Sequence, residues 1–174
     1  MSDFDGLFDG WHNDPEQNKP IDREKIEDVP LREKEVHVVN IYEAISEALD
    51  GSGRTTEFFV LLKDNSGRQL RISIVKEMAH AIYIAHRRIR PDRPLTHDLF
   101  FNVVEKLGGR IERVIVDDLL QSTFYARIII QKGDETIEMD ARPSDAIALA
   151  LRSRAPIYVA DQVLAISENE DLSE

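Results

Sequence analysis

An almost purely apolar segment near the C-terminal end constrains the fold of this chain more than any other feature. Residues 146–151 read AIALAL, with Pro143 and Asp145 before them and Arg152 after them. Proline and acidic residues favour the first turn of a helix and arginine favours the last, so we predict a helix at about 144–154. Since this helix has no polar face for almost two turns, it must be buried on nearly all sides.

The rest of the sequence alternates between strand-like and helix-like segments. Content of β-branched and aromatic residues predicts strands at 36–45, 56–63, 68–75, 110–118, 123–131, 136–141 and 156–160. Helical periodicity appears at 76–88 and at 96–107, where one apolar stripe contains Leu99, Phe100, Val103, Val104 and Leu107. Asp117 and Asp118 lie at the end of a predicted strand, where it meets a loop, and we expect them in a turn. This order predicts an α+β fold: a single domain with a mixed β-sheet packed against about three helices.

Composition narrows the class of protein. The chain has 174 residues, of which 42% are hydrophobic, and this is enough for one buried core. It contains no cysteine, which excludes disulfides, cysteine-ligated zinc and thiol catalysis. Because the sequence shows neither a signal-peptide pattern nor an apolar run of about 18 residues, we expect a soluble, cytoplasmic protein with no membrane partner.

The formal net charge of -11 is concentrated at the two ends of the chain. Residues 1–35 contain eleven acidic and five basic residues, which predicts a flexible acidic N-terminal arm. Residues 167–174 contain four acidic residues and form an acidic C-terminal tail. We assign the folded domain to the nearly neutral segment 36–166. Within it, HRRIRPDR at 86–93 either attracts an anion or complements the negative end of a helix dipole.

Four large apolar side chains interrupt the polar N-terminal arm at helical spacing: Phe4, Leu7, Phe8 and Trp11. Such a stripe is typical of an amphipathic helix that lies in a groove of another protein. We therefore expect this segment to dock onto a protein partner or onto a neighbouring subunit.

The stretch RPLTHDLF at 93–100 combines the features of a helix start with candidate catalytic groups. Thr96 is the expected helix cap, and Asp98 is a favourable acid in the first turn. The free backbone N–H groups of a helix N-terminus attract anions such as phosphate, and Arg93 adds positive charge. A cation is disfavoured at this end, so His97 is a candidate general base for phosphodiester hydrolysis. The alternative is a capped helix start with a histidine that has no catalytic role.

A second stretch, DARPSD at 140–145, repeats this arrangement before the buried helix. Asp140 and Asp145 are candidate ligands of a divalent cation, and Arg142 is a candidate phosphate-binding residue. Ser144 is a candidate helix cap and phosphate contact. In the alternative interpretation, Asp140 and Arg142 form a surface ion pair and the other residues only cap the helix. The sequence does not specify the identity of a metal.

Three segments, in this order and spacing, are similar to the bifunctional nuclease (BFN) domain family: RPLTHDLF, TFYARIII and DARPSDAIALALRSRAPIYVADQVL. The match covers roughly residues 36–166. The resemblance implies a single mixed domain that self-associates and acts on both DNA and RNA. The shared motif positions supply four candidate catalytic residues, His97, Asp98, Asp140 and Asp145, and four candidate phosphate contacts, Arg93, Thr96, Arg142 and Ser144. Nothing resembles a base-reading module, so we expect low sequence specificity.

One segment departs from the usual pattern of this family. Relatives have an Ile-Gly-x-x-Glu-Ala pattern entering the first helix, whereas IVKEMA at 74–79 has Val75 for the glycine and Met78 for the glutamate. The departure favours an alternative function, that of a catalytically inactive ligand-binding or scaffolding domain.

If the chain is a nuclease, we expect RPLTHD and DARPSD to lie together at one cleft, with Asp98, Asp140 and Asp145 orienting His97 or holding a metal. Carboxylates that converge on His97 would favour hydrolysis, and carboxylates saturated by salt bridges would favour scaffolding.

Overall fold

A computed structural model describes residues 32–47 and 54–171. Within these residues the elements are β1 (Glu33–Glu47), β2 (Arg54–Asp64), β3 (Gln69–Ile74), α1 (Lys76–His86), α2 (Thr96–Lys106), β4 (Arg110–Leu120), β5 (Thr123–Lys132), β6 (Glu135–Ala141), α3 (Pro143–Ser153), β7 (Ile157–Ala160) and α4 (Asp161–Asp171). Every predicted strand and helix is present, with boundaries shifted by a few residues. The predicted docking segment with Phe4, Leu7, Phe8 and Trp11 lies outside the described residues.

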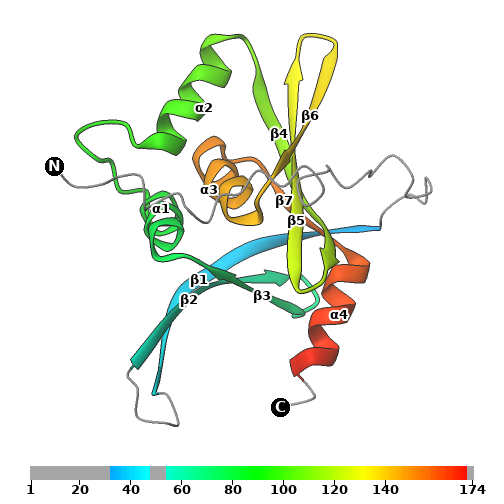
Figure 1. The fold of residues 1–174 in the computed structure, drawn as a ribbon. Coiled ribbons are helices and arrows are strands. Elements are labelled where there is room, and N and C mark those ends of the chain that lie inside the picture. The colour runs from blue at the N-terminus through cyan, green and yellow to red at the C-terminus, as the bar shows by residue number, and fades with distance from the viewer. Residues whose placement is uncertain (1–31, 48–53, 172–174) are drawn as a thin grey trace, which may run out of the picture. The chain divides into compact units, whose positions relative to one another are not determined.

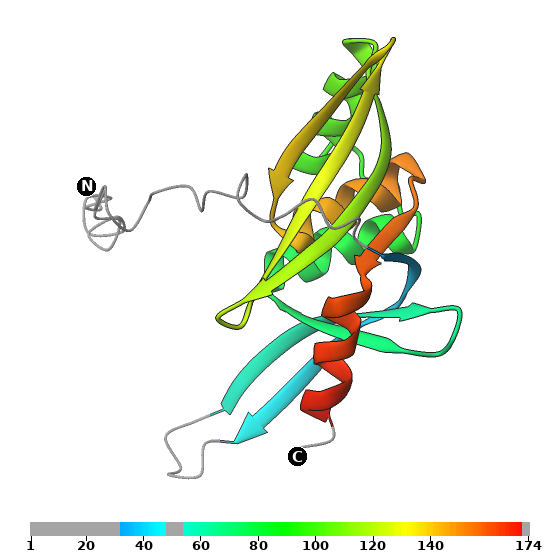
Figure 2. The same ribbon diagram turned by 90° about the vertical axis from the view of Figure 1, so that its right-hand side faces the viewer.

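The strands form one mixed sheet in the order β3-β2-β1-β7-β4-β5-β6. Neighbouring strands are antiparallel, except β4 and β7, which are parallel. The short strand β7 joins two halves of the sheet, because it pairs with residues 33–36 of β1 and with residues 114–116 of β4. Figures 1 and 2 show β1–β3 and β4–β6 running in different directions. The predicted α+β fold with a mixed sheet is confirmed.

The predicted buried helix, α3, is at the centre of the fold. Ala146, Ile147, Ala148 and Ala150 are fully buried, and Leu149 is 4% exposed. The helix packs against α1, α2, β4 and β5, and Figure 1 shows it between the two groups of strands. Small alanine side chains allow these elements to approach closely. The prediction that this helix is buried on nearly all sides is therefore confirmed.

Helix α2 is present as predicted, but its apolar stripe faces outward. The exposed members are Leu99 at 58%, Phe100 at 38%, Val103 at 46% and Leu107 at 66%. Phe101 and Val104 are the residues of this helix that pack against the core. Positions 97, 101 and 104 share a helix face, so the inward face is the one that carries His97. Periodicity predicts that a helix forms here, whereas the polar contacts described below determine which face turns inward.

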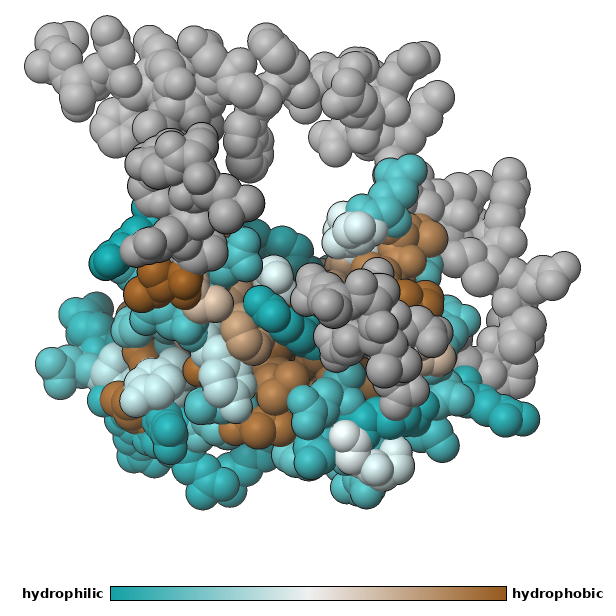
Figure 3. Space-filling view, turned by 90° about the horizontal axis from the view of Figure 1, so that it is seen from below, coloured by the Kyte–Doolittle hydropathy of each residue, from teal (hydrophilic) through white to brown (hydrophobic). Residues whose placement is uncertain are grey.

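Helix α4 was not predicted from the sequence. Its Val163 and Leu164 are fully buried, and it packs against β3, β4 and β7. Acidic residues dominate its second half and obscure the apolar periodicity in the sequence. Residues 167–171, which we expected in an acidic tail, form the end of this helix. Figure 3 views the domain from below, on the side of α4 and β1–β3, and shows hydrophobic patches between hydrophilic residues. No helix in the described part of the chain is long and apolar enough to span a membrane.

Asp117 lies inside β4 and not in the expected turn. The β4–β5 register shifts between Val116 and Asp118, so Asp117 is the additional residue of a β-bulge. Its side chain is buried, and Oδ2 accepts a hydrogen bond from Nε of Arg127 at 2.7 Å. The bulge accommodates this acidic residue inside β4, at a position where the alternation of polar and apolar residues in the sequence indicates the end of a strand.

Candidate functional site

The first turns of α2 and α3 meet and bring the two sequence stretches together. His97 lies in the first turn of α2, and Asp145 lies in the first turn of α3. Nε2 of His97 is 2.9 Å from Oδ1 of Asp145. The second oxygen of this carboxylate, Oδ2, accepts a hydrogen bond from Nε of Arg142 at 2.7 Å. RPLTHD and DARPSD therefore form one cluster, although His97 and Asp145 are 48 positions apart in the sequence.

The carboxylate of Asp145 orients the imidazole of His97. Burial raises the pKa of Asp145, but hydrogen bonds from Arg142 and His97 lower it more strongly, and the net pKa lies below its usual value. An ionised carboxylate can only accept hydrogen bonds, so Nε2 is the protonated nitrogen of the neutral ring. Nδ1 then carries the lone pair, in a side chain that is 14% exposed. This is the arrangement of a general base held by an acidic partner.

Asp98 stabilises the start of α2. Its Oδ2 accepts a hydrogen bond from the backbone N–H of Leu95 at 2.9 Å, and its Oδ1 accepts one from Nε of Arg152 at 2.5 Å. Burial raises the pKa of Asp98, whereas these two hydrogen bonds lower it, and the net direction is downward. Both carboxylate oxygens are therefore engaged by donors of the protein itself.

Arg152 is a residue of this cluster that the sequence analysis missed. Its side chain is 5% exposed. In addition to Asp98 of α2, it contacts two backbone carbonyl oxygens through Nη1, that of Ala148 in its own helix at 2.9 Å and that of Ala81 in α1 at 3.1 Å. Arg152 thus connects three helices. The sequence does contain a signal for this pair. Arg152 ends a helix that has no polar face, so its side chain is expected to be buried, and a buried cation requires a buried anion.

The predicted helix caps are wrong. Thr96 and Ser144 are residues of the first helical turns, and the N-cap positions belong to Leu95 and Arg142, without a hydrogen bond from a capping side chain. Asp98 replaces the expected cap of α2 by accepting the N–H of Leu95 from inside the helix. Ser144 is 7% exposed, whereas Thr96 is exposed. Their contacts with phosphate remain predictions.

Arg93, Asp140 and Arg142 lie at the surface around this cluster. Arg93 is exposed in the connection between α1 and α2. Asp140 is exposed near the end of β6, where its register partner in β5 is Arg127. The Arg142 side chain is 71% exposed although its Nε is bonded to Asp145. The structure therefore places cationic side chains of two segments at the surface, while His97, Asp98 and Asp145 are partly buried.

The carboxylates of Asp98 and Asp145 do not fit a divalent cation. In residues 32–47 and 54–171, no group of three or more His, Asp or Glu side chains is suitable for a metal ion. Asp98 and Asp145 each use both oxygens for protein donors. A cation at either carboxylate would have to displace these donors, so we derive no chemical step that involves a metal.

Val75 and Met78 occupy the start of α1. Val75 is the N-cap residue and is 59% exposed. Met78 is 7% exposed and belongs to the main hydrophobic core. At position 78 the chain therefore places an apolar side chain in the core, where the family pattern has a glutamate.

Comparisons with known proteins agree with the family resemblance of the sequence motifs. The family model described as "Bifunctional nuclease domain" matches residues 60–171. A Mycobacterium tuberculosis (strain ATCC 25618 / H37Rv) protein named "Uncharacterized protein Rv1829" is 42% identical over 106 residues, which cover 61% of this chain and 63% of the relative. "Bifunctional nuclease 1" of Oryza sativa subsp. japonica is 30% identical over 101 residues, 56% of this chain and 30% of the relative.

A second plant relative, "Bifunctional nuclease 1" of Arabidopsis thaliana, is 27% identical over 110 residues, which cover 62% of this chain and 34% of the relative. The chain therefore matches less than two thirds of the mycobacterial relative and about a third of the plant relatives. The family model covers more than half of the chain and includes the whole His97–Asp145 cluster. The chain belongs to the bifunctional nuclease domain family.

Proposed function

We propose that this chain is a phosphodiester hydrolase that cleaves DNA and RNA with low sequence specificity. The observation that carries the proposal is the 2.9 Å contact between Nε2 of His97 and Oδ1 of Asp145 at two adjoining helix N-termini. A histidine oriented by a carboxylate can act as a general base, and helix N-termini beside an exposed arginine favour a phosphate group. Both plant relatives are named bifunctional nucleases, which supports the same class of reaction.

In the proposed reaction, Nδ1 of His97 removes a proton from a water molecule whose oxygen attacks phosphorus. The bond between phosphorus and the leaving sugar oxygen breaks, and that oxygen takes a proton from the imidazolium. Asp145 stabilises the imidazolium while it exists, because its carboxylate accepts the hydrogen bond from Nε2. Arg142 and Arg93 interact with phosphate oxygens, whose negative charge increases in the transition state. The attacking group is water and not a ribose hydroxyl, so both DNA and RNA are substrates.

Substitution of His97 tests this mechanism. We expect His97→Ala to lower kcat by about 100-fold to 10,000-fold, the usual effect of removing a general base. Cleavage of labelled DNA and RNA oligonucleotides is measured with rigorously purified protein, together with the melting temperature. The matched control is His80→Ala, because His80 is an exposed histidine of α1. The control keeps the activity of the wild type, and both variants melt near the wild-type temperature.

Asp145→Asn and EDTA provide independent tests of the same site. The asparagine keeps the size of the side chain but removes the charge that stabilises the imidazolium, so kcat falls more than KM changes. We expect activity to persist in EDTA, because the carboxylates of Asp98 and Asp145 are engaged by donors of the protein. A fully active His97→Ala protein, or activity lost in EDTA but unaffected by both substitutions, would show that another group or a contaminating nuclease performs the cleavage.

The second candidate function is a ligand-binding or scaffolding domain without catalysis. It is favoured by the saturation of both carboxylates, since Asp98 pairs with Arg152 and Asp145 pairs with Arg142. In that case the two helix N-termini hold a phosphorylated ligand. A wild-type protein that cleaves no nucleic acid, but whose melting temperature rises with inorganic phosphate, would favour this function. The rise would be absent in Arg142→Ala.

A further inference from the structure

The sheet formed by β1, β2 and β3 has a second face that does not pack on the core. Val60, Leu62 and Leu70 are fully buried on the core side. The strand registers place the following residues on the opposite side: His37 with Lys63 and Gln69, Asn40 with Leu61 and Arg71, Tyr42 with Phe59 and Ser73, and Ala44 with Glu57. None of them is buried. We call this set the outer face.

Three planar groups are stacked across the outer face, one from each strand. The rings of Tyr42 and Phe59 have centroids 5.1 Å apart and an interplanar angle of 16°. Cζ of Arg71 lies 3.9 Å from the centroid of the Phe59 ring. Phe59 is therefore the middle of the stack, between an arginine and a tyrosine, and Tyr42 forms its end.

The end of the stack at Tyr42 is open. In the described part of the chain, β7 pairs with β1 only at residues 33–36, so no strand continues the sheet beside Tyr42. The Tyr42 side chain is 38% exposed. Its free side is therefore available for a further planar group, such as a nucleic-acid base, to stack on.

The outer face carries cations beside its aromatic stack. Among the residues in register there, Lys63 and Arg71 are cations and Glu57 is acidic. Nη2 of Arg71 lies 4.0 Å from Oε2 of Glu57, whereas Lys63 has no acidic partner in the described part of the chain. Glu35 lies on the same side of β1 as His37, toward the end that pairs with β7. Among the described residues, the outer face thus combines an aromatic stack with one paired and one unpaired cation.

Proteins that bind single-stranded nucleic acid combine these two features. Cations follow the phosphate backbone and aromatic rings stack with bases, whose faces are accessible in a single strand but covered in a duplex. We propose that the outer face binds single-stranded nucleic acid, with one base stacked on Tyr42 and the adjoining phosphates near Lys63 and Arg71. The choice of ligand rests on the proposed function, and the inference extends it by assigning strandedness and a second contact region apart from His97.

Fluorescence anisotropy of the full chain with labelled oligonucleotides tests the proposal. The probes are a 15-residue oligothymidylate, a 15-residue oligouridylate and a DNA duplex of the same length, at low salt. We expect both single strands to bind more tightly than the duplex. Tyr42→Ala should weaken binding of the single strands by about 5-fold to 100-fold, the range of one base–aromatic stack. Lys63→Gln should weaken binding and reduce the salt dependence by about one phosphate contact.

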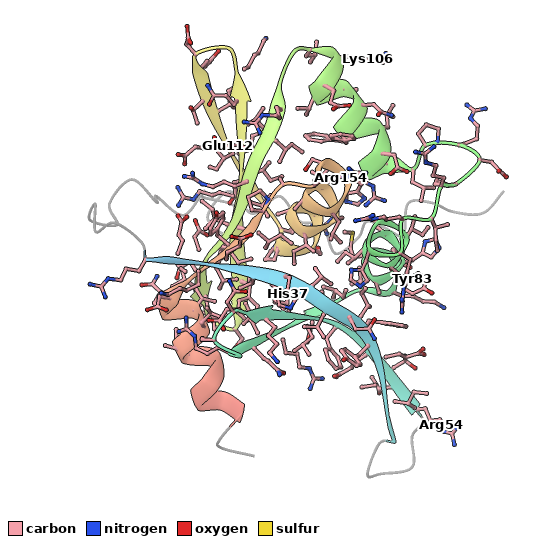
Figure 4. The ribbon with its side chains drawn as sticks, turned by 180° about the vertical axis from the view of Figure 1, so that it is seen from behind. His37, Arg54, Tyr83, Lys106, Glu112 and Arg154 are labelled. Carbon is pink, nitrogen blue, oxygen red and sulfur yellow. The ribbon has the colours of Figure 1, made fainter. Side chains whose placement is uncertain are left out.

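Two further variants separate stacking from general effects. Tyr42→Phe keeps an aromatic ring and should bind like the wild type. Tyr83→Ala is the matched control, because Tyr83 of α1 is 43% exposed and has Cζ of Arg87 5.7 Å from its ring centroid, outside the outer face. Figure 4 labels Tyr83 on α1 and His37 on β1, the strand that also carries Tyr42. This control should also bind like the wild type.

The outcomes separate this proposal from the proposed function. Binding that requires Tyr42, in a protein that does not cleave, supports the outer face and overturns the nuclease. Cleavage that requires His97, in a protein whose Tyr42→Ala variant binds as tightly as the wild type, supports the nuclease and overturns the role of the outer face. Equal affinity for single strands and duplex, or complete displacement of the oligonucleotide by polyglutamate at equal charge, would show that charge alone attracts the ligand. Either result would overturn the stacking proposal.

Discussion

At the residue scale, the partly buried charges of the candidate site depend on their partners, and Arg152 is the clearest example. We predict that Arg152→Met destabilises the protein by about 3 kcal/mol, because it leaves the Asp98 carboxylate, 25% exposed, without its cation. Urea denaturation measures the change. The double variant Asp98→Asn with Arg152→Met should be more stable than Arg152→Met alone, since it leaves no unpaired charge. Equal stability of these two proteins would contradict a dependence on this pair.

Asp64 makes the stability of the protein sensitive to acid. Burial raises its pKa, but hydrogen bonds from Ser66 and Arg68 lower it more strongly, from 3.8 to about 2. A pKa lowered by folding stabilises the protein above the unfolded value, and this contribution is lost as the pH falls toward the folded value. We predict that the urea midpoint of the wild type falls more than that of Asp64→Asn between about pH 5 and pH 2. Parallel curves would refute this.

Individual residues also show which parts of the candidate site could not be predicted from the sequence. The two motifs were found because capping residues, arginines and a histidine stand at fixed positions before apolar runs. The expectation that the two motifs lie together agrees with the contact between His97 and Asp145. Which of the three aspartates contacts His97 could not be derived, because it depends on how α2 and α3 pack together. Arg152 was missed for a related reason: an arginine in a last turn usually lies in solvent, and only the packing of α1 and α2 around α3 buries it.

At the element scale, α3 depends on the small volume of its alanines. Ala148 is fully buried on the face that approaches neighbouring helices and strands. We predict that Ala148→Leu overpacks this contact and lowers the free energy of unfolding by about 1 to 3 kcal/mol. Ala165→Leu, at an exposed position of α4, is the control with the same chemical change. An unchanged denaturation midpoint for Ala148→Leu would mean that the surrounding elements move apart without cost.

Elements differ in how far their sequences determine them. The helix at α3 and the hairpin of β2 and β3 were predicted because their local patterns and their packing agree. The orientation of α2 was not predictable, since its inward face contains His97 beside Phe101 and Val104, while four apolar residues remain outside. Helix α4 depends on Val163 and Leu164, a pair too short to give a period. The apolar pattern therefore determines neither the orientation of α2 nor the presence of α4, and both depend on tertiary contacts.

At the scale of the whole molecule, the exposed stripe of α2 bears on assembly. We propose that copies of this chain self-associate through Leu99, Val103 and Leu107, which repeat every four positions and carry no charge. A self-complementary contact suits a symmetric pair of helices, and an exposed apolar patch of this kind is typical of an interface. We predict an oligomer in sedimentation velocity and its dissociation by Leu107→Glu. Ile45→Glu, at a residue 62% exposed, is the matched control and should remain associated.

The short strand β7 also determines when this protein can finish folding during its synthesis. A ribosome delivers β1–β3 and then β4–β6, and each group can form local hairpins as it emerges. The two groups become one sheet only after residues 157–160 have left the ribosome, because Ile157 pairs with both Val36 and Val114. Until then, both groups retain open strand edges, the type of surface that pairs with other chains. The nascent protein is therefore most in need of protection by chaperones just before its last strand appears.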